Sequence, residues 1–180
     1  MFQFIRLEER HLELVLRWRT SESVTRYMFT DVEYNIDRQK QWFDRIKGSD
    51  TEKYWIIKMR GDLIGLISLN GLDYPNKRTS WGFYIGEEKY RMYGGLIPPY
   101  LYNFVFNQLN FNKITAEVME GNDNVTKMHR MHGYREVGIC KEHVYKYGRY
   151  HDTYVLELLK ERWESVSDKY KKYIAPFQIK

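Results

Sequence analysis

The chain has 180 residues, 43% of them hydrophobic and 17% aromatic, and a single cysteine, Cys140. This length suits one domain with a substantial core, residues 1–180, and a lone cysteine excludes an intramolecular disulfide. No stretch approaches the roughly 20 apolar residues of a membrane helix, and no basic and apolar leader opens the chain. We therefore expect a cytoplasmic protein with no membrane partner.

The formal charge is +5, with a pI of about 9.1. A basic surface suits a small anionic ligand and nucleic acid alike, so the net charge does not distinguish these two partners. We interpret the excess of basic residues as a solvated surface and predict no nucleic-acid partner.

The first 47 residues predict two amphipathic helices joined by a loop. Apolar residues recur at helical spacing in residues 8–19 and again in residues 35–47. Between them, residues 20–34 are polar but contain three adjacent bulky residues, Tyr27, Met28 and Phe29. This composition fits a loop that packs rings over a cavity, and equally a loop that is anchored to the core.

Alternation of apolar and polar residues predicts the strands. The first two flank a short turn at Gly61-Asp62 and form a hairpin, and residues 79–85 have two distinct faces, as expected of a central strand. The predicted strands are residues 54–58, 63–69, 79–85, 113–119, 137–147 and 154–158.

Later helices are predicted after Pro98, since proline is tolerated in a first turn, and at residues 124–132, where Gly133 can end the helix in a left-handed conformation. A charged helical tail follows, with residues 162–180 as its terminal part. The order of elements predicts a mixed α/β sheet with helices on both faces.

The segment RMYGG, residues 91–95, lies between a predicted strand and a predicted helix. Backbone N–H groups at the start of a helix bind phosphate, although a glycine pair also marks ordinary turns. The predicted phosphate cradle comprises Arg91, Met92, Tyr93, Gly94, Gly95 and Leu96.

Two asparagines follow the strand at residues 113–119. Their amides both donate and accept hydrogen bonds, which suits a peptide-like ligand, and asparagine is also a common helix N-cap. We assign the N-cap to Asn124 and a ligand contact to Asn122.

These two junctions resemble motifs of the GNAT N-acetyltransferase superfamily. RMYGG is similar to its pyrophosphate loop, Arg/Gln-x-x-Gly-x-Gly/Ala, and Asn122 followed by Gly133-Tyr134 is similar to its later motif. The likeness extends over most of the chain, and LRWRTSESVTRYM, WGFYIGE, KITAEVMEGND and YGRYHD most resemble the N-acetyltransferases of pseudaminic acid biosynthesis. The resemblance implies a mostly antiparallel central sheet flanked by helices on both faces.

It also implies acetyl-CoA as co-substrate and direct acetyl transfer to a primary amine. The acceptor would be the 4-amino group of a UDP-linked 4-amino-4,6-dideoxy sugar. Whether the chain forms a homodimer is left open.

Two positions depart from the family pattern. Leu96 stands where the loop usually ends in a small residue, and His129 stands where many members have a tyrosine thought to protonate the thiolate.

The resemblance implies which residues would form the oxyanion hole, the general base and the general acid. Backbone donors near Ile85 and Gly86 would hold the oxyanion. Glu120 would accept the amine proton, or would be an ordinary surface charge. His129 would donate a proton as an imidazolium with an ordinary pKa near 6.5, or would pack on its helix face. We expect no nucleophilic role for Cys140.

The resemblance also places the acceptor site. Arg19 could face a diphosphate, and the remaining candidates could wall a deoxysugar or a base, although all four could equally be packing residues. The five histidines lack zinc-ligand spacing, so no metal is expected. The candidate acceptor residues are Arg19, Met28, Phe29, Trp42 and Tyr84.

Other functions stay open at this point. The chain could acetylate ribosomal-protein N-termini or polyamines, although acidic residues are not concentrated in residues 20–47 as a polyamine site would require. It could also be a non-catalytic coenzyme A sensor or a basic RNA-associated module.

Overall fold

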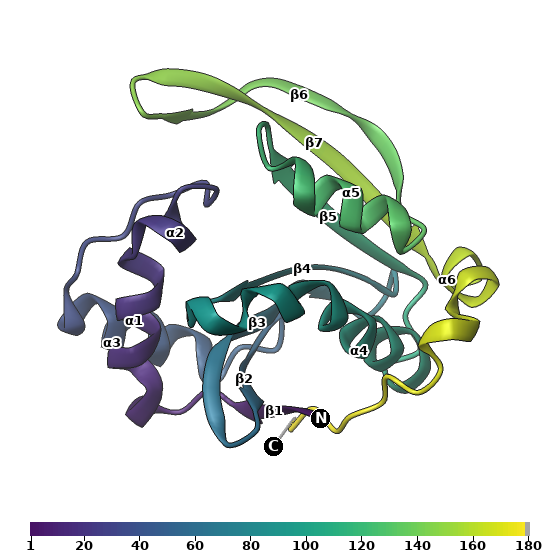
Figure 1. Cartoon of the computed structure of the whole chain (residues 1–180), viewed down its shortest axis with the longest axis horizontal. Helices are drawn as coiled ribbons and strands as arrows, with labels where there is room; N and C mark the ends of the chain where they lie inside the picture. Colours follow the sequence, from purple (N-terminus) through teal and green to yellow (C-terminus); the bar gives the residue numbers. More distant parts are fainter. Residues whose placement is uncertain (179–180) are drawn as a thin grey trace.

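A seven-stranded sheet with the order β1-β2-β3-β4-β5-β7-β6 organises residues 1–178, the part of the chain described by this computed structural model (Figure 1). All neighbouring strands are antiparallel except β4 and β5. The predicted mixed, mostly antiparallel sheet is confirmed, and β4 occupies its centre. The strands are β1 Phe2–Arg6, β2 Glu52–Met59, β3 Asp62–Asp73, β4 Arg78–Ile85, β5 Lys113–Met119, β6 Arg135–Lys146 and β7 Arg149–Leu159.

Helices cover both faces of the sheet because its central strands are apolar on both sides. On β2, Ile56 packs in a cluster with residues of α1 and α3, whereas Trp55 lies edge-to-face with Phe104 at 5.8 Å between ring centroids. The helices are α1 Leu12–Thr20, α2 Glu22–Thr25, α3 Ile36–Ile46, α4 Pro98–Asn103, α5 Asp123–Met131 and α6 Lys160–Val166. The 3₁₀ helices are η1 Glu9–His11, η2 Glu88–Leu96 and η4 Ser167–Tyr170, and η3 Phe104–Gln108 is a π-helix.

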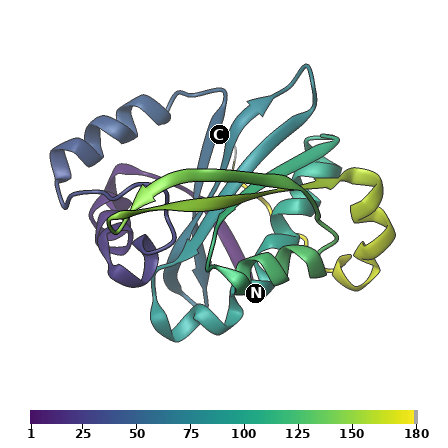
Figure 2. The ribbon, with the colours of Figure 1, turned by 90° about the horizontal axis from the view of Figure 1, so that it is seen from above.

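The parallel pair at the centre of the sheet is short. Only Arg78, Thr79 and Ser80 of β4 pair with β5, although both strands continue further. Figure 1 shows the two strands diverging, with β5, β6, β7 and α5 on one side and β1 to β4 on the other. Figure 2 shows the β6–β7 hairpin crossing above the sheet toward α1 and α2. The divergence divides the sheet into two arms, one of strands β1 to β4 and the other of strands β5 to β7.

The C-terminal tail is helical only as far as Tyr170, so the helix predicted for residues 162–180 is wrong beyond that point. Pro176 disfavours helical geometry at the residue before it. Phe177 instead stacks on Phe4 of β1, with ring centroids 4.2 Å apart, and forms an isolated parallel bridge with it. Residues 179–180 of the predicted tail lie outside the described residues. No helix within residues 1–178 has the length and apolar character needed to cross a bilayer.

Candidate active site

A cleft of about 830 Å³ opens where β4 and β5 separate. Its walls are the second half of β4 and the second half of β5. One end is formed by η2 and α5, and the other by α1, α3 and the loop between them. The residues that contribute from the two strands are Trp81, Gly82, Phe83, Tyr84, Ile85, Ala116, Glu117, Val118 and Met119.

Within residues 1–178, the facing edges of β4 and β5 have no strand partner inside the cleft. Their pairing stops at Ser80 and Thr115, so the backbone groups that follow face one another across the opening. Unpaired backbone N–H and C=O groups require hydrogen-bond partners, and an extended peptide-like ligand supplies them in the manner of an added strand. The cleft therefore suits a ligand that carries amides along an extended arm.

The predicted phosphate cradle forms the 3₁₀ helix η2 beside this cleft. Arg91 and Gly94 line the cleft, whereas the side chains of Met92 and Leu96 are 82% and 41% exposed. Leu96 is thus directed to solvent rather than to the cleft lining. Tyr93 is partly buried and lies 6.4 Å from the Tyr90 ring.

The two glycines of η2 are not required by the packing of the described chain. A Cβ on Gly94 would meet only Ile85 Cδ1, at an ordinary 3.7 Å, and a Cβ on Gly95 would meet no atom within 4 Å. Neither glycine has a positive φ. The lack of side chains leaves the backbone open to close approach by a ligand.

Replacing Gly94 with alanine is therefore expected to leave the free energy of unfolding within about 1 kcal/mol of the wild type, because alanine suits a helical turn better than glycine. If the phosphates bind at η2, as the sequence predicts, the added methyl group would obstruct them and the KM for acetyl-CoA should rise about tenfold. Urea unfolding and steady-state kinetics measure the two effects. Gly48→Ala, whose Cβ meets nothing within 4 Å in the described chain, is the control. Equal losses of stability and affinity would contradict this assignment.

The start of α5 corrects the N-cap predicted at Asn124, whereas Asn122 lies at the cleft as a ligand contact requires. Asn122 occupies the N-cap position and Asn124 lies in the exposed first turn. The side chain of Asn122 makes no capping hydrogen bond and lines the cleft. Asp123 is also a good first-turn residue, so the sequence leaves the boundary uncertain by two positions.

His129 lines the cleft from α5 but is buried, with only 3% of its surface exposed. Its ring lies 4.6 Å from that of Tyr134 and edge-on to Trp81 at 5.7 Å. Burial, and secondarily the neighbouring His132, lower the pKa of His129 to about 4. His129 is therefore neutral near pH 7, which corrects its expected role as an imidazolium acid.

Glu120 does not line the cleft. Its carboxylate pairs with Arg149 at 2.6 Å and lies 3.2 Å from His151 Nδ1. The hydrogen bond from Arg149 lowers the pKa of Glu120, which makes it a weaker base. Its partners lie on β7, far along the chain, so the sequence offered no sign of them.

Glu117 is the carboxylate that the sequence interpretation missed. It lines the cleft from β5 and has no ion pair within residues 1–178. Strand alternation was the available signal, because Ile114, Ala116 and Val118 are buried and Glu117 belongs to the opposite face.

Gly86 does not fit the predicted oxyanion hole. Its N–H donates to Ile64 C=O at 2.8 Å, so it is already engaged. A Cβ at this position would lie 2.1 to 2.4 Å from the Trp18 ring, which explains the glycine by packing. Ile85 lines the cleft, as expected.

Four of the five predicted acceptor residues line the other end of the cleft: Arg19, Met28, Trp42 and Tyr84. Phe29 does not; it lies edge-on to His143 at 6.3 Å. The Tyr84 hydroxyl is buried without a hydrogen-bond partner in the described chain, and burial raises its pKa. A buried hydroxyl of this kind is a ready contact for a polar ligand group.

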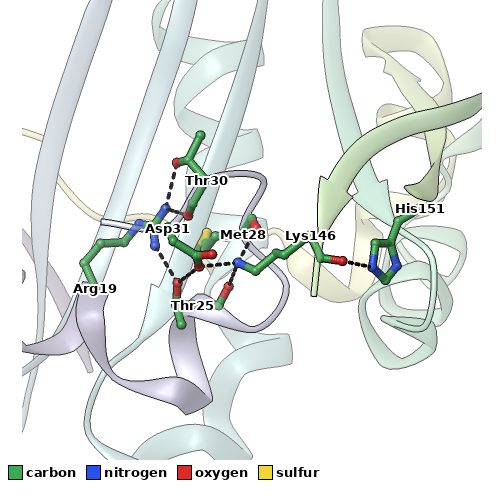
Figure 3. A network of polar contacts seen from close by, with 7 residues as sticks. All are labelled: Arg19, Thr25, Met28, Thr30, Asp31, Lys146 and His151. Carbon is green, nitrogen blue, oxygen red and sulfur yellow. Dashed lines mark hydrogen bonds and ion pairs between the residues drawn. The ribbon is translucent and has the colours of Figure 1, made fainter. Parts of the chain in front are cut away.

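Arg19 is committed to the loop beside it. Its guanidinium donates to Thr25 Oγ1 at 3.1 Å and to Thr30 C=O at 2.7 Å (Figure 3). Arg19 thus holds protein groups rather than presenting a free fork to a diphosphate. Within residues 1–178, no group of three or more His, Cys, Asp or Glu side chains could hold a metal ion.

Three curated or solved proteins illustrate what the chain resembles. The candidate ribosomal N-acetyltransferase YdaF of Bacillus subtilis (strain 168) is 30% identical over 107 residues, which cover 58% of this chain and 57% of that protein. The uncharacterized N-acetyltransferase p20 of Bacillus licheniformis is 24% identical over 164 residues, or 88% of this chain and 92% of that protein.

Among solved structures, the spermidine N-acetyltransferase of Vibrio cholerae, in complex with CoA and spermine, superposes with a TM-score of 0.85 at 18% identity. The superposition covers 91% of this chain and 98% of that one, and it shows a shared fold. Residues 5–155 match the family described as the acetyltransferase (GNAT) domain. The chain therefore belongs to the GNAT acetyltransferase family.

Proposed function

We propose that this acetyltransferase binds acetyl-CoA along the open edges of β4 and β5 and transfers the acetyl group directly to one primary amine of a small molecule. The observation that carries the proposal is the divergence of β4 and β5 after three residue pairs, beside a glycine-containing turn. The pantetheine amides would pair with the strand edges, and the pyrophosphate would lie at η2 near Arg91 and Gly94.

In the proposed reaction the neutral amine nitrogen attacks the thioester carbonyl carbon. The tetrahedral intermediate collapses, the C–S bond breaks and coenzyme A leaves as a thiolate. Glu117 has by then taken one proton from the bound ammonium, directly or through water, to leave the neutral amine, and the second amine proton is lost to solvent as the intermediate collapses. The thiolate is then protonated by solvent, while the neutral imidazole of His129 can donate only a hydrogen bond, since its pKa is about 4.

Replacement of Glu117 by glutamine should lower kcat by about 100-fold at pH 7, the usual contribution of a general base. The isosteric amide keeps the shape of the cleft but accepts no proton. The loss should shrink as pH rises toward the pKa of the amine, because more amine is then already neutral. A matched Glu120→Gln variant should retain its kcat. The pH profile of kcat measures both, and an unchanged profile in Glu117→Gln would exclude the role.

For the acceptor, we propose a nucleotide-linked amino sugar over a polyamine. Three arginines and three carboxylates line the cleft, so it has no excess of negative charge toward a polycation: Arg19, Arg38, Arg91, Asp31, Glu33 and Glu117. Asp31 is paired with Lys146, and Glu33 with Arg38.

The remaining acceptor wall is aromatic. Trp42 and Tyr54 lie edge-to-face at 5.1 Å, next to Met28 and Tyr84 in the lining. Such a wall suits the methyl face of a deoxysugar or a base. A polyamine stays the second candidate because the superposed Vibrio cholerae protein is a spermidine acetyltransferase.

Thiol release from acetyl-CoA tests the proposal against three acceptors: a UDP-4-amino-4,6-dideoxy sugar, spermidine and ribosomal N-terminal peptides. We expect turnover with the nucleotide sugar. Turnover confined to spermidine would replace the first acceptor with the second. Tight coenzyme A binding without turnover of any acceptor would favour a binding module.

A further inference from the structure

Lys146 carries a buried ammonium group at the tip of the β6–β7 hairpin. Only 2% of its side chain is exposed. It is the last residue of β6, before a turn in which Tyr147 and Gly148 both have positive φ. This two-residue turn matches the twist of the strands and fixes the hairpin tip.

The Lys146 ammonium makes its hydrogen bonds to the segment between α1 and α3, and it also lies 5.2 Å from the centroid of the Tyr147 ring. It donates to Thr25 C=O at 2.7 Å and to Met28 C=O at 3.0 Å, and it pairs with Asp31 Oδ1 at 2.7 Å (Figure 3). An ammonium has three donors, and here all three have acceptors. This arrangement compensates the high cost of burying the charge.

The same loop is also held from the opposite arm of the molecule. Arg19 of α1 binds Thr25 and Thr30, and Thr25 Oγ1 donates to Asp31 Oδ1 at 3.1 Å. Behind Lys146, its C=O accepts from His151 Nε2 at 3.0 Å, and His151 Nδ1 lies near Glu120 at the end of β5. The contacts thus run from β5 and β7 through Lys146 to α1, across the divergence of β4 and β5.

The loop, residues 25–31, contributes Tyr27, Met28, Thr30 and Asp31 to the acceptor end of the cleft, whereas Lys146 does not line it. The groups proposed to hold acetyl-CoA lie on η2, α5 and the edges of β4 and β5. A displacement of the loop therefore alters one end of the cleft and leaves the other in place.

We propose that Lys146 is a positioning residue that fastens residues 25–31 across the cleft and thereby sets the affinity for the amine acceptor. Lys146 does not itself line the cleft, so it acts through the loop. Its effect on the acceptor KM depends on the proposed function; its effect on the loop does not.

The test begins with the loop itself. In Lys146→Ala, amide hydrogen exchange in residues 25–31 should accelerate at least about tenfold, because two carbonyl groups and Asp31 lose their shared donor. n-Propylammonium replaces the atoms lost beyond Cβ and should restore protection, whereas 1-propanol, which has no charge, should not. Lys146→Met keeps the apolar stem and should behave as Lys146→Ala does. Lys141→Ala, on the same strand with a 73% exposed side chain, is the control.

Steady-state kinetics provide the second test of the role of Lys146. The acceptor KM of Lys146→Ala should rise about tenfold while the KM for acetyl-CoA and kcat change less than about twofold. Unchanged loop exchange, equal rescue by 1-propanol, or a parallel rise in both KM values would each overturn the assignment. If the wild type turns over none of the three acceptors, the proposed function fails while the exchange measurements still decide the role of Lys146.

Discussion

Replacement of Gly65 by alanine is expected to disrupt the centre of the sheet and to abolish activity. A Cβ at this position in β3 would lie 2.1 Å from the Tyr84 carbonyl oxygen and 3.0 Å from Ile85 Cα. Both atoms belong to the backbone, so no side-chain rotation relieves the contact. Strand β4 would have to move away from β3, with the loss of the pairing between Gly65 and Ile85.

The expected loss exceeds about 4 kcal/mol in the free energy of unfolding, at the upper end of single-residue effects. Any protein that still folds should have lost acetyl transfer, because Tyr84 and Ile85 line the cleft. Urea denaturation and thiol release measure the two outcomes. Gly138→Ala on β6 is the matched control, since its Cβ would meet nothing within 4 Å in the described chain, and it should change stability by less than about 0.5 kcal/mol. A Gly65→Ala protein of normal stability would show that β4 is not held at this distance.

The second large effect is a loss of stability in mild acid. His129 and His132 are both buried, and burial is the main reason that the pKa of each is lowered to about 4. The pKa of His129 is lowered further by the neighbouring His132, and that of His132 by Lys169. In the unfolded chain each histidine titrates near its ordinary pKa of 6.5. Between these values the unfolded state binds more protons, so stability is complete above pH 6.5 and falls as the pH drops toward 4.

For each histidine, the difference between a pKa of 6.5 and one of about 4 lowers the free energy of unfolding by on the order of 3 kcal/mol once the pH is below both values. Carboxylates with a lowered pKa act at lower pH: Glu157, whose pKa is lowered by Lys113 and then by Arg135, loses its contribution below its ordinary 4.5. Urea unfolding at pH 7.0, 6.0 and 5.0 therefore isolates the histidines.

His129→Phe should lower the slope of the free energy of unfolding against pH in this range by somewhat less than half, because burial also lowers the pKa of His11; the exposed His143→Gln is the control. The same phenylalanine variant tests the thiolate step. Because His129 is neutral at pH 7, its replacement should leave the pH profile of kcat unchanged between pH 6 and 8. Stability that does not vary between pH 7 and 5 would show that both rings are hydrated or paired in solution.

Local pattern was a sound guide where one periodicity dominates a segment. Alternation in residues 79–85 identified the central strand, and helical spacing in residues 35–47 identified α3, which starts with Asn35 as its N-cap. The RMYGG turn was recognisable by its position, directly after one predicted strand and before one predicted helix. These features depend on neighbours in the chain.

Site assignments failed where a distant partner decided the role of a residue. The sequence offers Glu120 as a base or as a surface charge, but Arg149 and His151 engage its carboxylate. The sequence places Gly86 at the oxyanion hole, but its N–H donates to Ile64 C=O and a side chain there would collide with Trp18. None of these partners lies close in the sequence.

The amino-acid sequence by itself determined the type and order of most elements, the family likeness and the two junctions that flank the cleft, because periodicity and turn chemistry are local properties of the chain. Only the tertiary structure decided that Glu117 rather than Glu120 faces the cleft, that His129 is neutral, and that Lys146 holds residues 25–31. Burial and long-range pairing set the charge and the availability of a side chain, and both arise when β5, β6 and β7 are brought opposite α1 and its loop.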